Sequence, residues 1–159
     1  MTRIKMTKGK FALVDDEDVE KVSRFKWYTL EKDGLFYGNS TVYIPVRKKK
    51  LYQMHRVIMN APKGLQVDHI NGDRLDNRRS NLRLCTQSQN ASNRGKNKNN
   101  TSGYKGVSWN KREKKWSARI RVNGKLYFLG NFIDIKYAAQ AYNIAAKKYH
   151  KQFANGNRE

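Results

Sequence analysis

The segment Ala91–Ser102 limits the fold more than any other part of the sequence, because it cannot contribute to a hydrophobic core. Its sequence, ASNRGKNKNNTS, contains one hydrophobic residue among asparagines, serines and cations. Such a stretch buries too little surface to offset its ordering entropy. A chain of 159 residues is one ordinary domain or two small ones. We therefore expect two small domains, 1–93 and 103–157, joined by a basic linker over 94–102.

The charge balance indicates a polyanionic partner. The chain has 34 Lys and Arg against 13 Asp and Glu, a formal net charge of +21. Residues 91–159 carry 16 basic and 3 acidic side chains, whereas residues 1–90 carry 18 and 10. An imbalance of this size attracts nucleic acid, although ribosomal and membrane-surface proteins are also basic. The charge says nothing about the fold.

Cysteine usage and hydropathy exclude several classes of protein. The single cysteine, Cys85, cannot form an internal disulfide and fits a reducing compartment; we interpret it as a small core residue. No apolar run approaches the roughly 18 residues of a membrane span. The basic N-terminus is not followed by the apolar stretch of a signal peptide. We expect a monomer that has no membrane partner.

The first sixty residues show short strand and helix patterns. The acidic run Asp15–Asp18 is interpreted as the N-terminal cap of a short helix ending near Arg24, not as a metal site. A second short helix is expected over His55–Asn60, with His55 as a hydrogen-bond donor. Strands are expected at Lys10–Val14, Trp27–Leu30, Leu35–Asn39 and Thr41–Val46, with a turn at Asp33-Gly34 and a basic hairpin tip at Arg47–Lys50.

The most informative stretch runs from Gln66 to Asn90. Gln66–Ile70 alternates as a strand, Asn71-Gly72 is a turn signal, and a polar loop leads to a second strand at Asn81–Cys85. Thr86 and Gln89 have the spacing of a capping box that starts a helix. The predicted order is strand, loop, strand, helix.

This order gathers side chains suited to metal-assisted hydrolysis. Asp68 and His69 end the first strand, and Asn90 lies in the first turn of the helix. A carboxylate and an amide oxygen are ligands for Mg²⁺ or Mn²⁺. An imidazole has the pKa that a general base needs. Adjacent strand residues point to opposite faces, so Asp68 and His69 need a bend to serve one site.

The Asp-His pair, Asn81 twelve positions after His69 and Asn90 nine further on resemble the motif of the HNH, or ββα-metal, endonucleases, especially the homing type of phages and introns. The resemblance covers about residues 54–93 and includes His55-Arg56 and Leu75–Arg78. It implies that His69 is the general base and that Asp68 and Asn90 hold one divalent cation. It also implies that Asn81 bridges backbone groups and keeps His69 aimed.

Asn90 stands where the family name expects histidine. Homing-type members commonly have asparagine there, so the resemblance implies Mg²⁺, with Mn²⁺ as the alternative, and no structural zinc. Arg83 on the second strand is a candidate phosphate contact or a solvated strand residue. Asp76 is expected to close an Asx turn in the loop.

The C-terminal part predicts a sheet covered by one helix. Strands are expected at Tyr104–Asn110, Lys115–Val122 and Lys125–Asn131, with the hairpin signal Asn123-Gly124 between the last two. In the middle strand, apolar and basic residues alternate. Asp134 caps a helix whose apolar stripe is rich in alanine and packs on the sheet, which leaves a basic face for a major groove. The stripe is Ile135, Ala138, Ala139, Tyr142, Ala145, Ala146 and Tyr149.

Tyr-Lys-Gly-Val at 104–107, Trp116, Ala-Arg-Ile at 118–120 and the alanine pairs of the helix resemble the Apetala-two/ethylene-response-factor domain. That domain is known from plant transcription factors and phage homing nucleases. The resemblance implies that the sheet reads DNA through Lys105, Ser108, Asn110, Arg119 and Arg121. Ser108 and Asn110 replace arginines of the plant domains, so the plant target sequence is not carried over.

The sequence thus predicts an α+β protein in which a mixed N-terminal region leads into a ββα-metal core, followed by a three-stranded antiparallel sheet on one helix. We expect a sequence-directed, metal-dependent endonuclease acting on double-stranded DNA in the cytoplasm of a bacterium or phage-infected host. The alternatives are a catalytically inactive transcription factor and a basic RNA-binding protein. The target sequence and the number of strands cut remain open.

Overall fold

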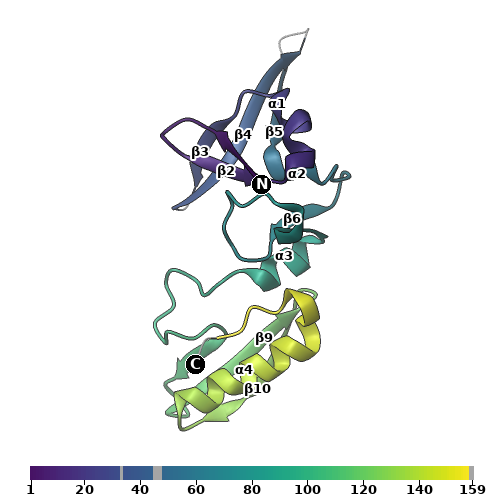
Figure 1. Ribbon diagram of the computed structural model, residues 1–159. Helices are drawn as coiled ribbons and strands as arrows, with labels where there is room; N and C mark the ends of the chain where they lie inside the picture. The colour runs from purple at the N-terminus through teal and green to yellow at the C-terminus, as the bar shows by residue number, and fades with distance from the viewer. Residues whose placement is uncertain (33, 45–47, 158–159) are drawn as a thin grey trace. The chain divides into compact units, whose positions relative to one another are not determined.

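The computed structural model describes residues 1–32, 34–44 and 48–157, which form two compact units, Met1–Thr86 and Gln87–Glu159 (Figure 1). Each unit combines small antiparallel sheets or strand pairs with short helices, so the expected α+β class is confirmed. None of the described helices is both long and apolar enough to cross a membrane.

The first unit is built from a hairpin, a three-stranded sheet and the strand pair that carries the predicted site. The sheet has the order β3-β4-β5, and β1 pairs with β2 and β6 with β7. Its elements are β1 (Thr2–Lys5), β2 (Phe11–Val14), η1 (Asp16–Asp18), α1 (Val19–Ser23), β3 (Tyr28–Lys32), β4 (Leu35–Ile44), β5 (Lys48–Gln53), α2 (Met54–Ile58), β6 (Gln66–His69), η2 (Arg79–Asn81) and β7 (Leu82–Cys85).

The two strands expected around residue 40 are one continuous strand, β4. The polar pair Asn39-Ser40 suggested a break, but both residues are buried and pair with Gln53 and Tyr52 of β5. The ladder therefore runs through them. Asp33 of the expected turn and Arg47 of the expected hairpin tip lie outside the described residues, and Lys48 already belongs to β5.

The run Asp15–Asp18 lies at the start of η1 and α1, as expected, but the two N-cap residues, Asp15 and Asp18, form no side-chain cap hydrogen bond. Asp15 accepts a hydrogen bond from the backbone N–H of Arg79 at 2.7 Å, and buried Asp18 accepts two from the Arg79 guanidinium at 2.8 and 2.7 Å. A helix of five residues has a weak dipole, whereas a distant arginine offers charge-assisted hydrogen bonds. The acidic run therefore fastens η2, the turn that precedes β7.

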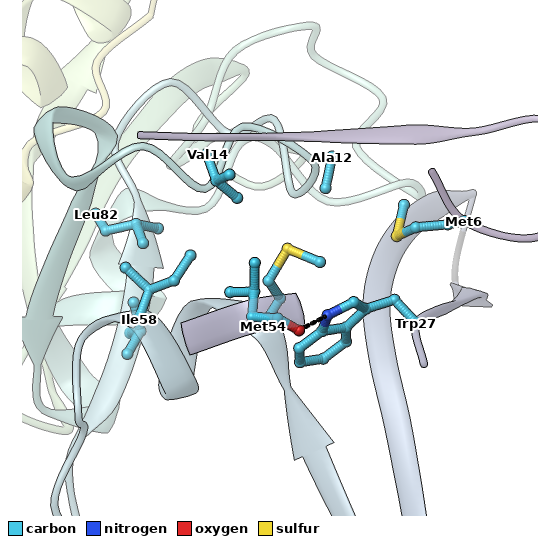
Figure 2. Packing of buried hydrophobic residues seen from close by; sticks show 9 residues of the cluster. Met6, Ala12, Val14, Trp27, Met54, Ile58 and Leu82 are labelled. Carbon is cyan, nitrogen blue, oxygen red and sulfur yellow. Dashed lines mark hydrogen bonds between the residues drawn. The ribbon is translucent and has the colours of Figure 1, made fainter. Parts of the chain in front are cut away.

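One hydrophobic core joins the N-terminal hairpin to the predicted site. Trp27 seals it by donating from Nε1 to the Val22 carbonyl at 2.8 Å (Figure 2). Val67 of β6 and Leu82 of β7 belong to this core, so its packing anchors both site strands, each buried side chain contributing about 1.5–3 kcal/mol. The buried members are Met6, Ala12, Val14, Val22, Trp27, Met54, Ile58, Val67 and Leu82.

The second unit contains the expected three-stranded sheet with a helix on one face. The sheet order is β10-β9-β8, with antiparallel pairing throughout. Asn123 and Gly124 both have positive φ, as the predicted hairpin turn requires. The elements are α3 (Gln87–Asn93), β8 (Val107–Asn110), β9 (Lys115–Val122), β10 (Lys125–Phe132), α4 (Ile135–His150) and η3 (Lys151–Phe153).

Small residues let α4 lie close to the sheet (Figure 1). Asp134 caps the helix by accepting from the Lys136 N–H at 2.7 Å. Its buried residues are Ala138, Ala139, Tyr142, Ala145 and Ala146, as the periodicity predicted, whereas Tyr149 is 41% exposed. Gly106 has φ 73°, and a Cβ there would collide with the Tyr142 ring, which explains the glycine before β8.

Candidate active site

The predicted catalytic pair ends strand β6, and a turn follows it at once. Gly72 donates its N–H to the His69 carbonyl at 3.0 Å with φ 81°, so the chain bends directly after His69. Opposite on β7, Arg83 pairs with Asp68 and Leu82 with His69. Asp68 and His69 are each 1% exposed. The bend that the sequence required is present.

Short polar side chains shape the loop that follows the bend. Asn71 Oδ1 accepts from the Asp73 N–H at 2.8 Å, and Asp73 Oδ1 accepts from the Leu75 N–H at 2.9 Å. These two Asx turns fix the backbone without any regular ladder. Asp76 accepts from the Arg78 N–H at 3.4 Å, the expected Asx turn, and from its guanidinium at 2.7 Å, which lowers the pKa of Asp76.

Asn81 spans the loop from one side to the other. Its Nδ2 donates to the Asp76 carbonyl at 2.8 Å, and its Oδ1 accepts from the Asn71 N–H at 2.9 Å. Its own carbonyl accepts from the Ile70 N–H at 2.9 Å. The structure therefore places Asn81 between backbone groups on both sides of the loop, and its role in aiming His69 stays a prediction.

The loop is also fixed from outside, by strand β2. Leu13 donates to the Leu75 carbonyl and accepts from the Asn77 N–H, both at 2.8 Å. With the Asp18–Arg79 ion pair, these bonds hold both ends of the segment between Leu75 and Arg79 against the N-terminal part of the unit. The first eighteen residues thus support the predicted site.

His69 has a defined ring orientation. Its Nε2 lies 3.3 Å from Oδ1 of Asn77, a residue that is 1% exposed. Because Nδ2 of Asn77 donates to the Leu75 carbonyl at 3.2 Å, the amide oxygen is the atom that faces the ring. An amide oxygen only accepts, so Nε2 carries the hydrogen and Nδ1 is the basic nitrogen.

Burial keeps this imidazole neutral. It lowers the pKa of His69, and it lowers the pKa of His55 to about 3. The two rings meet edge to face with their centroids 5.1 Å apart. A neutral ring at neutral pH is the form that a general base needs. His55 is thus a neutral ring packed against His69.

Asp68 is held by an arginine. Arg83 donates from Nε and Nη2 to Asp68 Oδ2 at 2.9 and 2.7 Å, across the β6–β7 pair. The Arg83 guanidinium therefore faces the predicted metal ligand, and its contact with DNA stays a prediction. A buried carboxylate that already attracts a cation suits a divalent ion, and Arg83 would compete for Oδ2.

The remaining predicted ligand lies in the other unit. Asn90 belongs to α3, so its approach to Asp68 stays a prediction. Over the described ranges of the chain, no three His, Cys, Asp or Glu side chains group as metal ligands. An ion at Asp68 would therefore need oxygen from an amide, from water or from the substrate.

The five predicted DNA-reading residues lie in the second unit and differ in exposure and in hydrogen bonding. Ser108, Arg119 and Arg121 are exposed. Arg119 and Arg121 alternate with buried Ala118 and Ile120 on β9, so the basic side faces away from α4. Arg121 also donates to the Gly124 carbonyl at 2.8 Å.

Lys105 and Asn110 are engaged within their own unit. The Lys105 ammonium donates to the carbonyls of Ser92, Arg94 and Asn155 at 2.7, 2.6 and 3.3 Å, and burial lowers its pKa to about 8. Asn110 accepts from the Arg112 and Glu113 N–H groups and closes the turn after β8. A DNA contact of either residue stays a prediction.

Several site residues were not found from the sequence. Asn77 was noted only as part of the Leu75–Arg78 resemblance, and no local pattern assigns its amide to His69. The Asp68–Arg83 pair follows from the register of β6 and β7. That register could not be predicted, because a long irregular loop joins the two strands. Cys85 is 2% exposed, and burial raises its pKa, so its interpretation as a core residue is confirmed.

Comparison with known proteins fits this site. The family model described as HNH endonuclease matches residues 52–92, which run from the end of β5 into α3. The chain is 32% identical over 157 residues to a protein of Acanthamoeba polyphaga mimivirus named uncharacterized HNH endonuclease L560. That alignment covers 95% of this chain and 76% of the relative.

A second relative is Protein 3.8 of Escherichia phage T7, which is 36% identical over 93 residues. This alignment covers 58% of the chain and 76% of the phage protein. The family match ends at residue 92, so the resemblance of the C-terminal part to an Apetala-two/ethylene-response-factor domain stays a prediction. The match to the motif-bearing segment and the extent of the mimivirus alignment place this chain in the HNH endonuclease family.

Proposed function

We propose that the protein is a homing-type endonuclease that hydrolyses phosphodiester bonds of double-stranded DNA with one divalent cation. The observation that carries this proposal is the state of His69, which is neutral, buried and fixed through Nε2 by Asn77. We infer that its Nδ1, although buried, is the nitrogen that accepts a proton from the attacking water. Family membership supports nuclease activity, and the net charge of +21 supports a nucleic-acid substrate.

In the proposed reaction, each residue of the predicted site has a separate task. His69 takes the water proton, the water oxygen bonds to phosphorus, and the bond to the 3′ oxygen breaks. Asp68 and Asn90 would hold the cation, which would supply charge stabilisation at the phosphate and the leaving oxygen. Asn77 and Asn81 touch no reacting atom; they position His69 through the contacts described above.

Metal removal tests this function. We expect supercoiled plasmid to be nicked with Mg²⁺ or Mn²⁺, to stay intact with EDTA, and to be nicked again when excess Mg²⁺ is restored. Gel electrophoresis of the plasmid measures the result, beside a structured RNA as a second substrate. An intact plasmid across divalent ions and salt concentrations would overturn the enzyme proposal and favour a DNA-binding protein. Selective binding of the RNA would favour the RNA-binding alternative.

We further propose that the exposed side of the β8–β10 sheet directs the nuclease to its target. Arg119 and Arg121 are two of its exposed cations on β9, and Ser108 lies on the same side, because it pairs with Ser117 of β9. Leu126 and Phe128 of β10 pair with Arg121 and Arg119 of β9, and both apolar side chains are exposed. Apolar groups beside arginines suit contacts with thymine methyl groups and phosphates.

Alanine at these two positions tests the proposed interface. We expect Arg119→Ala and Arg121→Ala each to weaken binding of the target duplex by about 1–3 kcal/mol if they read bases, or to reduce the salt slope by about 1 if they contact phosphate. A gel-shift titration at several salt concentrations measures both quantities. Lys136→Ala, which removes an exposed cation from α4, is the matched control. Unchanged affinity and slope in both arginine variants would remove this face from the interface.

A further inference from the structure

Arg74 is a partly buried cation in the site loop whose charge is not balanced by any carboxylate of the described residues. Three other arginines of the loop and β7 each form an ion pair: Arg78 with Asp76, Arg79 with Asp18 and Arg83 with Asp68. Over the part of the chain that the structure describes, Arg74 forms none within 4.0 Å. Its Nε is buried without a hydrogen-bond partner.

The position of Arg74 points to the same centre as His69. The carbonyl of Leu75, the residue after Arg74, accepts from Asn77 Nδ2 at 3.2 Å, and Oδ1 of the same Asn77 lies 3.3 Å from Nε2 of His69, so Arg74 directly precedes the backbone that contacts the ring through Asn77. The flanking backbone is fixed by the Asx turns of Asn71 and Asp73. The charge is therefore held beside the proposed general base by a shaped loop.

Tyr37 of β4 gives the guanidinium a platform. The Arg74 Cζ lies 5.5 Å from the centroid of the Tyr37 ring. Contact with an aromatic ring orients the planar group and leaves its N–H donors for other acceptors. A planar fork of N–H groups matches the spacing of phosphate oxygens.

An unpaired, partly buried cation is costly unless an anion meets it. The anion that the proposed function brings to this place is the scissile phosphate. We propose that Arg74 is a catalytic residue that binds a non-bridging oxygen of this phosphate and stabilises its charge in the transition state. The inference rests on the proposed function. Arg74 takes part in no proton transfer in that reaction, and the water proton passes to His69 as before.

The test compares wild type, Arg74→Gln and Arg74→Lys, with Arg24→Gln as an exposed control directly after α1. We expect Arg74→Gln to lower kcat by about 10²–10³-fold, as loss of one oxyanion donor does. Lysine should restore part of kcat, because it keeps the charge without the fork. The affinity for uncleaved DNA should change by less than about threefold, since many other cations bind the backbone. Single-turnover kinetics and gel shifts give these values.

Two further measurements separate catalysis from a structural role. The urea midpoint of Arg74→Gln should not fall, because the variant removes an unpaired cation. Sulfur can replace either non-bridging oxygen of the scissile phosphate, which gives two phosphorothioate diastereomers. One of them should lower the cleavage rate of wild type but should not lower that of Arg74→Gln further. A kcat within about threefold of wild type, or a lost kcat matched by a lower urea midpoint, would overturn the inference for an active wild type. A wild type that cleaves nothing with any divalent ion would instead reject the proposed function, and this inference with it.

Discussion

Replacing His69 by alanine is expected to remove detectable plasmid cleavage. Proton transfer by a positioned base contributes about 10²–10⁴-fold, and no second histidine is placed to replace it. His55 touches the same ring but has a pKa of about 3, so it is a far weaker base. The measurement is the rate of nicking with Mg²⁺ under single-turnover conditions.

The control for this change is His150→Ala. His150 lies at the end of α4 in the second unit, where its Nδ1 is 3.2 Å from the Ser92 hydroxyl. Its loss removes an imidazole without touching the loop, so cleavage should persist. Gel shifts should show that His69→Ala still binds DNA. Nicking by a folded His69→Ala protein at a rate near that of wild type would reject His69 as the base.

The part of the site that could be predicted from the sequence is the part with local causes. Asn71-Gly72 turns the chain because glycine accepts positive φ, and Asp76 closes an Asx turn two residues away. The Asn123-Gly124 hairpin and the Asp134 cap follow from equally short-range chemistry. Such features need only a few neighbouring residues, so a single sequence contains them.

The unpredicted part depends on contacts between distant residues. Asp18 and Arg79 are 61 positions apart, and nothing near Asp18 distinguishes a partner of an arginine from a helix cap. The resemblance to the Apetala-two/ethylene-response-factor domain implied a sheet position for Lys105, yet the residue precedes β8 and donates to three carbonyls. Burial of its methylene stem with a satisfied ammonium is a tertiary effect that no spacing reveals.

Changing Asn81 to aspartate replaces the side-chain NH₂ group by an oxygen atom. We expect this change to lower the free energy of unfolding clearly. The side chain is buried, and the change keeps the acceptor for the Asn71 N–H but removes the donor to the Asp76 carbonyl. Two acceptors then face each other, one of them charged. An unsatisfied buried group costs about 1–3 kcal/mol and a charged one more, so the urea midpoint should fall clearly.

The pH dependence of this loss identifies its cause. A carboxyl facing a carbonyl is stabilised by protonation, so its pKa in the folded state lies above that in the unfolded state. The folded state then binds more protons, and the stability of Asn81→Asp should improve relative to wild type as the pH falls. Asn60→Asp, at an exposed position of the same unit, adds the same charge without this effect. The difference in the free energy of unfolding between Asn81→Asp and wild type could instead stay constant from neutral to acidic pH. The hydrogen bond from Asn81 to the Asp76 carbonyl would then not be what stabilises the loop, and the positioning of His69 would need another explanation.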